Sequence, residues 1–111
     1  MLPTLHAINA LISSSCSKKP VWILGSGESI KYPENGGDIT VSAGAQSAPI
    51  AFGEAGVKPI EIDVAMIYDS FSITVLTLLE DLGFCGKGEG GPWVSGGKLR
   101  FDRPSDGPAI N

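Results

Sequence analysis

The sequence predicts an α/β fold with two parallel strands and two helices in the order strand–helix–strand–helix. Three observations support this prediction: two short apolar runs rich in β-branched residues, two stretches with apolar residues at helical spacing, and glycines and prolines between them. The chain has 111 residues, of which 42% are hydrophobic and 18% are charged, as is typical of one globular domain.

The first half of this pattern is one strand followed by one helix. The strand is predicted at Val21–Leu24, a run of β-branched, aromatic and aliphatic residues. The helix is predicted over about residues 48–55. Ser47 can cap this helix, and Pro49 suits its first turn. Gly56 then supplies the stop.

The second half repeats the pattern with a stronger signal. Val64–Ile67 is continuously apolar, as in a strand that is covered on both faces of a parallel sheet. Asp69 or Ser70 can cap the helix that follows, and Gly83 ends it. Its apolar residues recur at helical spacing: Ile73, Leu76, Leu79 and Leu82. A right-handed crossover is expected to join the two parallel strands.

The last third of the chain shows less periodicity. From Cys85 onward the sequence is rich in glycine and predicts an extended loop. Few apolar residues remain there to pack, and we interpret them as a short hairpin: Trp93, Val94, Leu99 and Phe101.

Charge and cysteine content narrow the possible partners and the compartment. The net charge of −4 and the isoelectric point near 4.7 argue against a nucleic-acid partner. No apolar run approaches the roughly 20 residues that cross a bilayer, and the N-terminus lacks the pattern of a signal peptide. Cys16 and Cys85 form no disulfide framework, which predicts a cytoplasmic protein. With a single histidine, His6, no metal-ligand spacing is present.

Tyr68 is the strongest candidate for chemistry, because it ends the second strand just ahead of a helix N-terminus. Ligands of open parallel sheets bind beyond the carboxyl ends of the strands. A phenol there can donate a hydrogen bond to a developing oxyanion or move a proton, and the helix start attracts negative charge. The alternative is a tyrosine that closes the strand end with its hydroxyl in water.

Other candidates are weaker. The glycines of 86–91 could wrap closely around a ligand, but a flexible surface loop is the favoured interpretation because neither nucleotide-binding pattern fits. Gly25-Ser-Gly27 also fails as a dinucleotide site. Cys16 or Cys85 would need partners from elsewhere in order to act as a nucleophile.

Two stretches resemble a known family. Asp63–Phe71 (DVAMIYDSF) and Leu78–Gly91 (LLEDLGFCGKGEGG) are similar to the C-terminal half of thiolases, and most of all to the lipid-transfer-protein (sterol-carrier) type. The likeness continues through three further stretches, Val21–Gly27, Ser42–Gly56 and Pro108–Asn111. It divides the chain into an atypical segment, residues 1–20, and a partial thiolase C-terminal-half domain, residues 21–111.

The resemblance implies an acyl-CoA enzyme, either an acetyl-CoA acetyltransferase or a lipid-transfer-type retro-aldolase, with a CoA thioester as substrate and no bound cofactor or metal. In the family, the position of Tyr68 carries an asparagine or histidine of an oxyanion hole. Tyrosine there departs from that pattern and is similar to the aldolases, in which it would move the proton of the substrate hydroxyl. Substrate-binding positions are implied at Phe71, Gly90, Gly91 and Asn111.

The resemblance also implies that the site is incomplete. The nucleophilic cysteine and the Gly-His-Pro segment of thiolases have no counterpart in this chain, so we expect a fragment that is inactive alone. Because two strands and two helices leave apolar surface uncovered, a homo-oligomer is expected, with a companion chain of OB-fold type as a possible further partner. The alternative is a free-standing remnant that acts as a small binding or oligomerisation module.

Overall fold

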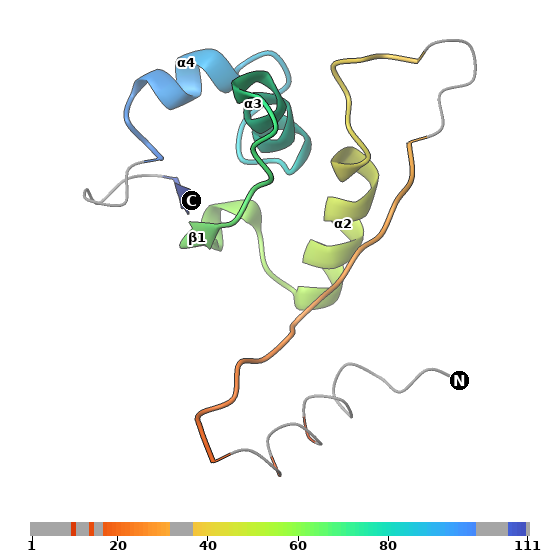
Figure 1. Ribbon diagram of the computed structural model, residues 1–111, viewed down its shortest axis with the longest axis vertical. Coiled ribbons are helices and arrows are strands. Elements are labelled where there is room, and N and C mark those ends of the chain that lie inside the picture. The colour runs from red at the N-terminus through yellow and green to blue at the C-terminus, as the bar shows by residue number, and fades with distance from the viewer. Residues whose placement is uncertain (1–9, 11–13, 15–16, 32–36, 100–106, 111) are drawn as a thin grey trace.

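The computed structural model describes residues 10, 14, 17–31, 37–99 and 107–110 (Figure 1). Along these residues the chain forms helix α2, a 3-10 turn η2, strand β1, helices α3 and α4, and strand β2. Their bounds are Gly44–Ala55, Pro59–Glu61, Val64–Ala65, Ser72–Asp81, Gly90–Ser95 and Ala109–Ile110.

The two strands are parallel, which confirms the predicted α/β class. Val64 of β1 faces Ala109 of β2, and Ala65 faces Ile110. The chain passes through α3 and α4 between the strands, so that this connection is a helical crossover (Figure 1).

The predicted strands were wrong in two respects. The second strand is Val64–Ala65 and not Val64–Ile67, and it is not covered on both faces, because Val64 is 62% and Met66 78% exposed.

The first predicted strand is absent. Val21–Leu24 has no regular secondary structure, and the strand that pairs with β1 comes instead from the C-terminal end. A strand needs a neighbour whose N–H and C=O groups match its own, and an apolar run does not reveal whether that neighbour exists. The exposed fraction of Val21 is 88%, so this run is not a buried strand.

Helix α2 begins at Gly44, ahead of the predicted start at about residue 48. Pro49 therefore lies inside the helix and not in its first turn. The helix begins early because the Ser42 hydroxyl accepts a hydrogen bond from the Gly44 N–H at 3.1 Å. The predicted stop is confirmed: Gly56 has φ of 68°, and its N–H donates to the Phe52 carbonyl at 2.9 Å.

Residues 25–29 run alongside α2 (Figure 1). The Ser26 N–H donates to Glu54 at 2.9 Å. A Cβ atom at Gly27 would overlap the Ser47 carbonyl, and one at Gly25 would lie 2.8 Å from the Ala55 nitrogen. The two glycines therefore allow the backbone of this segment to approach α2 closely. This explains the Gly25-Ser-Gly27 motif, which fits no nucleotide site.

We expect Gly27→Ala to lower the free energy of unfolding by ~1–3 kcal/mol, because backbone atoms of α2 must move to admit the methyl group. Gly53→Ala, within α2, is the matched control, since a Cβ atom at Gly53 meets nothing within 4 Å. It should raise the free energy by ~0.5–1 kcal/mol. Urea denaturation measures both, and equal effects of the two substitutions would contradict the close packing.

Helix α3 and its stop agree with the sequence. Leu79 is fully buried, with 0% of its surface exposed. Gly83 has φ of 84°, and the Phe84 N–H donates to the Leu79 carbonyl at 3.0 Å, which closes the helix in a Schellman arrangement. The predicted cap was wrong: Phe71 occupies the N-cap without a side-chain hydrogen bond, and the Ser70 hydroxyl bonds the Thr74 hydroxyl at 2.9 Å instead.

Helix α4 replaces the predicted loop and hairpin. Gly90–Ser95 is helical, and a proline in its first turn, Pro92, suits it. The Gly90 N–H donates to Glu80 Oε1 at 2.9 Å, so that a carboxylate from α3 caps the new helix. This cap is distant in sequence, which is why the local pattern did not reveal it. Phe101 lies outside the described residues.

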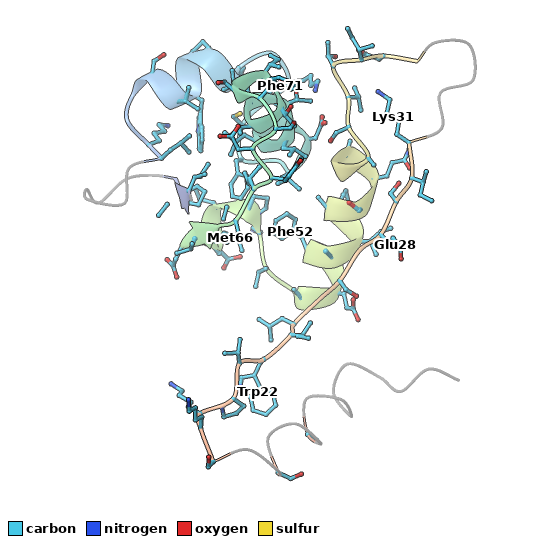
Figure 2. All side chains as sticks on the ribbon, in the orientation of Figure 1. Trp22, Glu28, Lys31, Phe52, Met66 and Phe71 are labelled. Carbon is cyan, nitrogen blue, oxygen red and sulfur yellow. The ribbon has the colours of Figure 1, made fainter. Side chains whose placement is uncertain are left out.

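The core is small for the size of the chain. Among the described hydrophobic residues only Ala48, Ile67 and Leu79 are buried. The solvent-accessible surface is 8250 Å², against roughly 5,800 Å² for a compact protein of 11.5 kDa. Many large apolar side chains are exposed, among them Trp22 on the part of the extended segment beyond α2 (Figure 2).

Candidate functional site

The carboxyl ends of β1 and β2 lie at one edge of the sheet, because the strands are parallel. The chain leaves β1 at this edge through a segment with alternating burial. Ile67 is buried with 6% exposed, whereas Tyr68 is 80% exposed. β1 ends at Ala65, so Tyr68 lies three residues beyond the strand and not at its end as predicted, and its side chain is exposed.

Phe71 lies near Tyr68, at the start of α3. It occupies the N-cap, and its side chain is 73% exposed. The first turn of α3 carries neither a capping side chain nor an acidic residue. The positive end of the helix dipole is thus open at Phe71, as a site for a carbonyl oxygen or an enolate requires.

The other predicted substrate-binding residues lie elsewhere. Gly90 is buried against Glu80, near the C-terminal end of α3, and Gly91 follows it on an exposed turn of α4. With 10 residues, α3 is about 15 Å long. Tyr68 and Phe71 thus precede the first turn of α3, whereas Gly90 lies against Glu80 near the other end of the helix. Asn111 lies outside the described residues.

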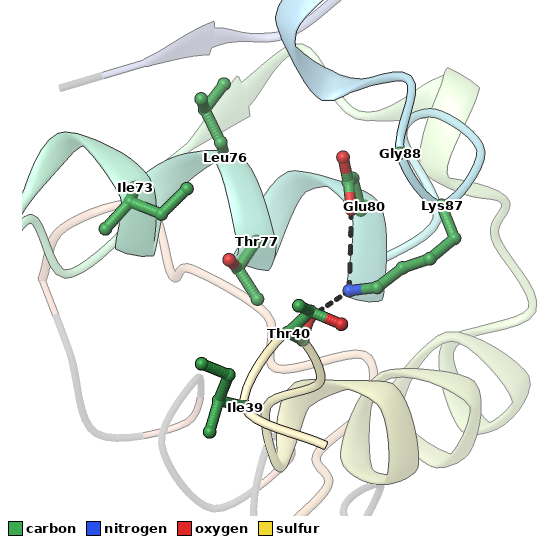
Figure 3. A pocket seen from close by; sticks show the side chains of 8 residues that line it. All are labelled: Ile39, Thr40, Ile73, Leu76, Thr77, Glu80, Lys87 and Gly88. Carbon is green, nitrogen blue, oxygen red and sulfur yellow. Dashed lines mark hydrogen bonds and ion pairs between the residues drawn. The ribbon is translucent and has the colours of Figure 1, made fainter.

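A groove of about 460 Å³ runs along α3 (Figure 3). It lies between the helix and the segment around Ile39, and a second hollow of about 340 Å³ continues it. Ile39, Ile73 and Thr77 line both hollows. The sequence did not predict this groove, because Ile39 and Thr40 lie in a stretch without a periodic signal.

A cluster of charges, which we call the hub, closes one end of the groove. Lys87 Nζ lies 2.9 Å from Asp81 Oδ1 and 3.4 Å from Glu80 Oε2. It also donates to the Thr40 carbonyl (Figure 3). Asp81 Oδ2 accepts the Ser42 N–H at 2.6 Å. The adjacent acidic residues Glu80 and Asp81 were the only signal of this cluster in the sequence. They do not identify their partners, which are distant in the sequence.

Hydrogen bonds set the charge states of the hub. Burial alone would raise the pKa of Asp81, but the Ser42 N–H and Lys87 outweigh it and leave that pKa below its usual value. Backbone N–H groups of Gly88 and Gly90 lower the pKa of Glu80. The pKa of Lys87 is raised, chiefly by its hydrogen bond to Asp81. All three groups are therefore charged at neutral pH.

Cys85 is poorly suited to act as a nucleophile. Burial raises the pKa of its thiol, and the nearby carboxylates of Glu80 and Glu89 raise it further. Cys16 lies outside the described residues. Within the parts of the chain that the structure describes, no group of three acidic, histidine or cysteine side chains is placed to hold a metal ion. Nor does any helix there have the length and apolar character to cross a membrane.

Comparison with known proteins gives a consistent picture. The family model for thiolase C-terminal domain-like proteins matches residues 25–104. Acetyl-CoA acetyltransferase of Methanocaldococcus jannaschii is 45% identical over 62 residues, which cover 55% of this chain and 15% of that protein. Steroid side-chain-cleaving aldolase of Thermomonospora curvata is 40% identical over 50 residues, or 45% of this chain and 13% of that protein.

A solved structure shows the same relationship in three dimensions. The Ltp2-ChsH2(DUF35) aldolase superposes with a TM-score of 0.72 at 26% identity, over 81% of this chain and 25% of that one. The chain thus spans a quarter or less of the length of these relatives.

Proposed function

The chain belongs to the thiolase C-terminal domain-like family, and on that premise we propose that it forms part of an enzyme acting on carbon–carbon bonds of CoA thioesters. Family membership confirms the resemblance that Asp63–Phe71 and Leu78–Gly91 predicted. Between the two activities considered, acetyl transfer and retro-aldol cleavage, we favour cleavage. The aldolase superposition, which covers 81% of the chain, supports this choice.

One observation carries the proposal: Tyr68 is 80% exposed in the short segment between the carboxyl end of β1 and the uncapped start of α3. In a retro-aldol step, a base removes the proton of the substrate hydroxyl. The bond between the carbinol carbon and the α-carbon then breaks, which yields a carbonyl product and a thioester enolate. Tyr68 suits the proton transfer, and the N–H groups at the start of α3 suit the enolate oxygen.

The remaining groups of such a site must come from outside the matched residues, since this chain covers only part of its relatives. We propose that further protein, in the same or a companion chain, completes it. The name of the aldolase structure joins two components, which supports a companion chain for this one, of the OB-fold type that the resemblance implies.

Ligand binding tests the proposal on the 111-residue chain itself. In proton–nitrogen correlation spectra, millimolar acetyl-CoA should shift the amide signals of residues 66–73 more than those of α2. Phe71→Ala should weaken these shifts. Ile60→Ala is the matched control, because Ile60 is 74% exposed and Phe71 73%. Shifts confined to other residues, or none at all, would argue against a thioester site at this edge.

A second candidate function is a small binding or oligomerisation module. The exposed apolar residues favour it, because uncovered surfaces of this kind commonly mark interfaces. Sedimentation of the chain over a hundredfold range of concentration distinguishes the two. Self-association without any acetyl-CoA shift at residues 66–73 would favour the module.

A further inference from the structure

The segment Asp38–Ser42, which we call the strap, is a preformed turn. Asp38 Oδ1 accepts both the Thr40 N–H at 2.8 Å and the Thr40 hydroxyl at 2.7 Å. The Val41 N–H donates to the Asp38 carbonyl at 3.3 Å. These bonds lie within the strap, so it can move as a unit without losing them.

The strap forms one wall of the groove. Ile39 and Thr40 line one side of it, with Thr40 close to Glu80 and Lys87, and Ile73 and Thr77 of α3 line the opposite side (Figure 3). Ile39 is 91% exposed, so apolar packing does little to hold the strap in place. The width of the groove therefore depends on the polar ties of the strap.

Two of these ties meet at one carboxylate, Asp81. One oxygen accepts the Ser42 N–H at 2.6 Å, and the other lies 2.9 Å from Lys87 Nζ, which also binds the Thr40 carbonyl. The Asp81 side chain is only 3% exposed, so its charge requires these partners. Lys87 belongs to the glycine-rich loop, which is far from the strap in the sequence.

We propose that Lys87 is an ionic latch, which fastens the strap to the C-terminal end of α3 and so keeps the groove narrow. Release of Lys87 removes the tie at Thr40 and leaves Asp81 held by Ser42 alone. The strap, which Lys31 still holds through the Asp38 and Val41 carbonyls, then moves away from α3 together with Lys31, and the groove between Ile39 and Ile73 widens.

The latch is insensitive to pH near neutrality. The pKa values of Glu80 and Asp81 are lowered. The two charged carboxylates therefore stabilise the latch fully above their usual pKa values near 4, and this stabilisation is lost only as the pH falls through the lowered pKa values. The pKa of Lys87 is raised above 10.5, so its contribution is lost only in stronger alkali. The other charged groups nearby are Glu89, Lys31 and Asp38, and the pKa of Asp38 is lowered as well, chiefly by its hydrogen bond from the Thr40 hydroxyl.

Ionic strength and chemical change at Lys87 are therefore the signals to which this latch responds. The Lys87 side chain is 42% exposed, so that salt and modifying enzymes can reach it. Acetylation would abolish the charge and with it the tie to Asp81.

Amide hydrogen exchange on the full chain tests the proposal. In Lys87→Met, the amides of the strap, and Ser42 above all, should exchange about tenfold faster. Loss of a hydrogen bond to a charged group can accelerate exchange by more than tenfold. The effect is smaller here because solvent screens the charge of the exposed lysine. Lys87→Arg keeps the charge and should restore slow exchange. Lys19→Met, on an exposed residue, is the control for the change in net charge.

A double-mutant cycle with Asp81→Asn identifies the partner. If Lys87 acts partly through Asp81, Lys87→Met should accelerate strap exchange less in the Asp81→Asn background than in the natural chain, with a remainder from the ties to Glu80 and Thr40. Equal acceleration in both backgrounds would rule out Asp81 as the partner. Unchanged exchange at Ser42 in Lys87→Met would overturn the latch. Equal acceleration in the strap and in α2 would also overturn it, because Lys87 would then stabilise the whole chain and not the strap.

Discussion

Replacing Tyr68 by phenylalanine should lower the rate of carbon–carbon bond cleavage by ~10²- to 10⁴-fold, the range expected for loss of a positioned acid–base group. The measurement uses a chimera in which this chain replaces the matching stretch of the Thermomonospora curvata aldolase. The chimera with Tyr68 intact is the reference. Side-chain cleavage is followed as release of the thioester product.

The physical reason lies in what the substitution removes. Phenylalanine keeps the aromatic ring and deletes only the hydroxyl, and Tyr68 is 80% exposed, so the fold loses little. The loss should therefore appear in kcat, with KM nearly unchanged. Ser70→Ala is the control, because it removes a hydroxyl two residues away that bonds Thr74. If Tyr68→Phe retains full turnover, Tyr68 is not the proton-transfer group.

Leu79→Ala should destabilise the chain by ~2–5 kcal/mol, the range measured for deletion of a buried leucine side chain. Leu79 has 0% of its surface exposed and lies where α3 faces the rest of the fold. Small domains have only about 5–15 kcal/mol of stability, and a core this limited places the chain near the low end. The variant should therefore show a clearly lower urea midpoint, or no folded baseline.

Ile73→Ala is the matched control on the same helix. Its side chain is 67% exposed, and the change should stay within about 0.5 kcal/mol. Equal losses for Leu79→Ala and Ile73→Ala would mean that α3 does not bury Leu79 in solution.

Local patterns determined much of this protein. The apolar spacing in α3, the glycine stops at Gly56 and Gly83, and the family motif of Asp63–Phe71 are all properties of neighbouring residues. Helical periodicity, a positive φ and the motif each depend on a few consecutive positions, so the sequence alone was sufficient for them. Tyr68 is different: the sequence predicted it at a strand end, but β1 ends at Ala65, three residues earlier.

Only the tertiary structure decided the rest, because it depends on residues that are far apart in the chain. The partner of β1 is Ala109–Ile110 and not Val21–Leu24, since pairing depends on which backbone arrives alongside. Helix α4 begins where Glu80 captures the Gly90 N–H, and α2 begins early where Ser42, held by Asp81, meets Gly44. In each case a carboxylate of α3 satisfies a backbone donor that local sequence leaves unpaired.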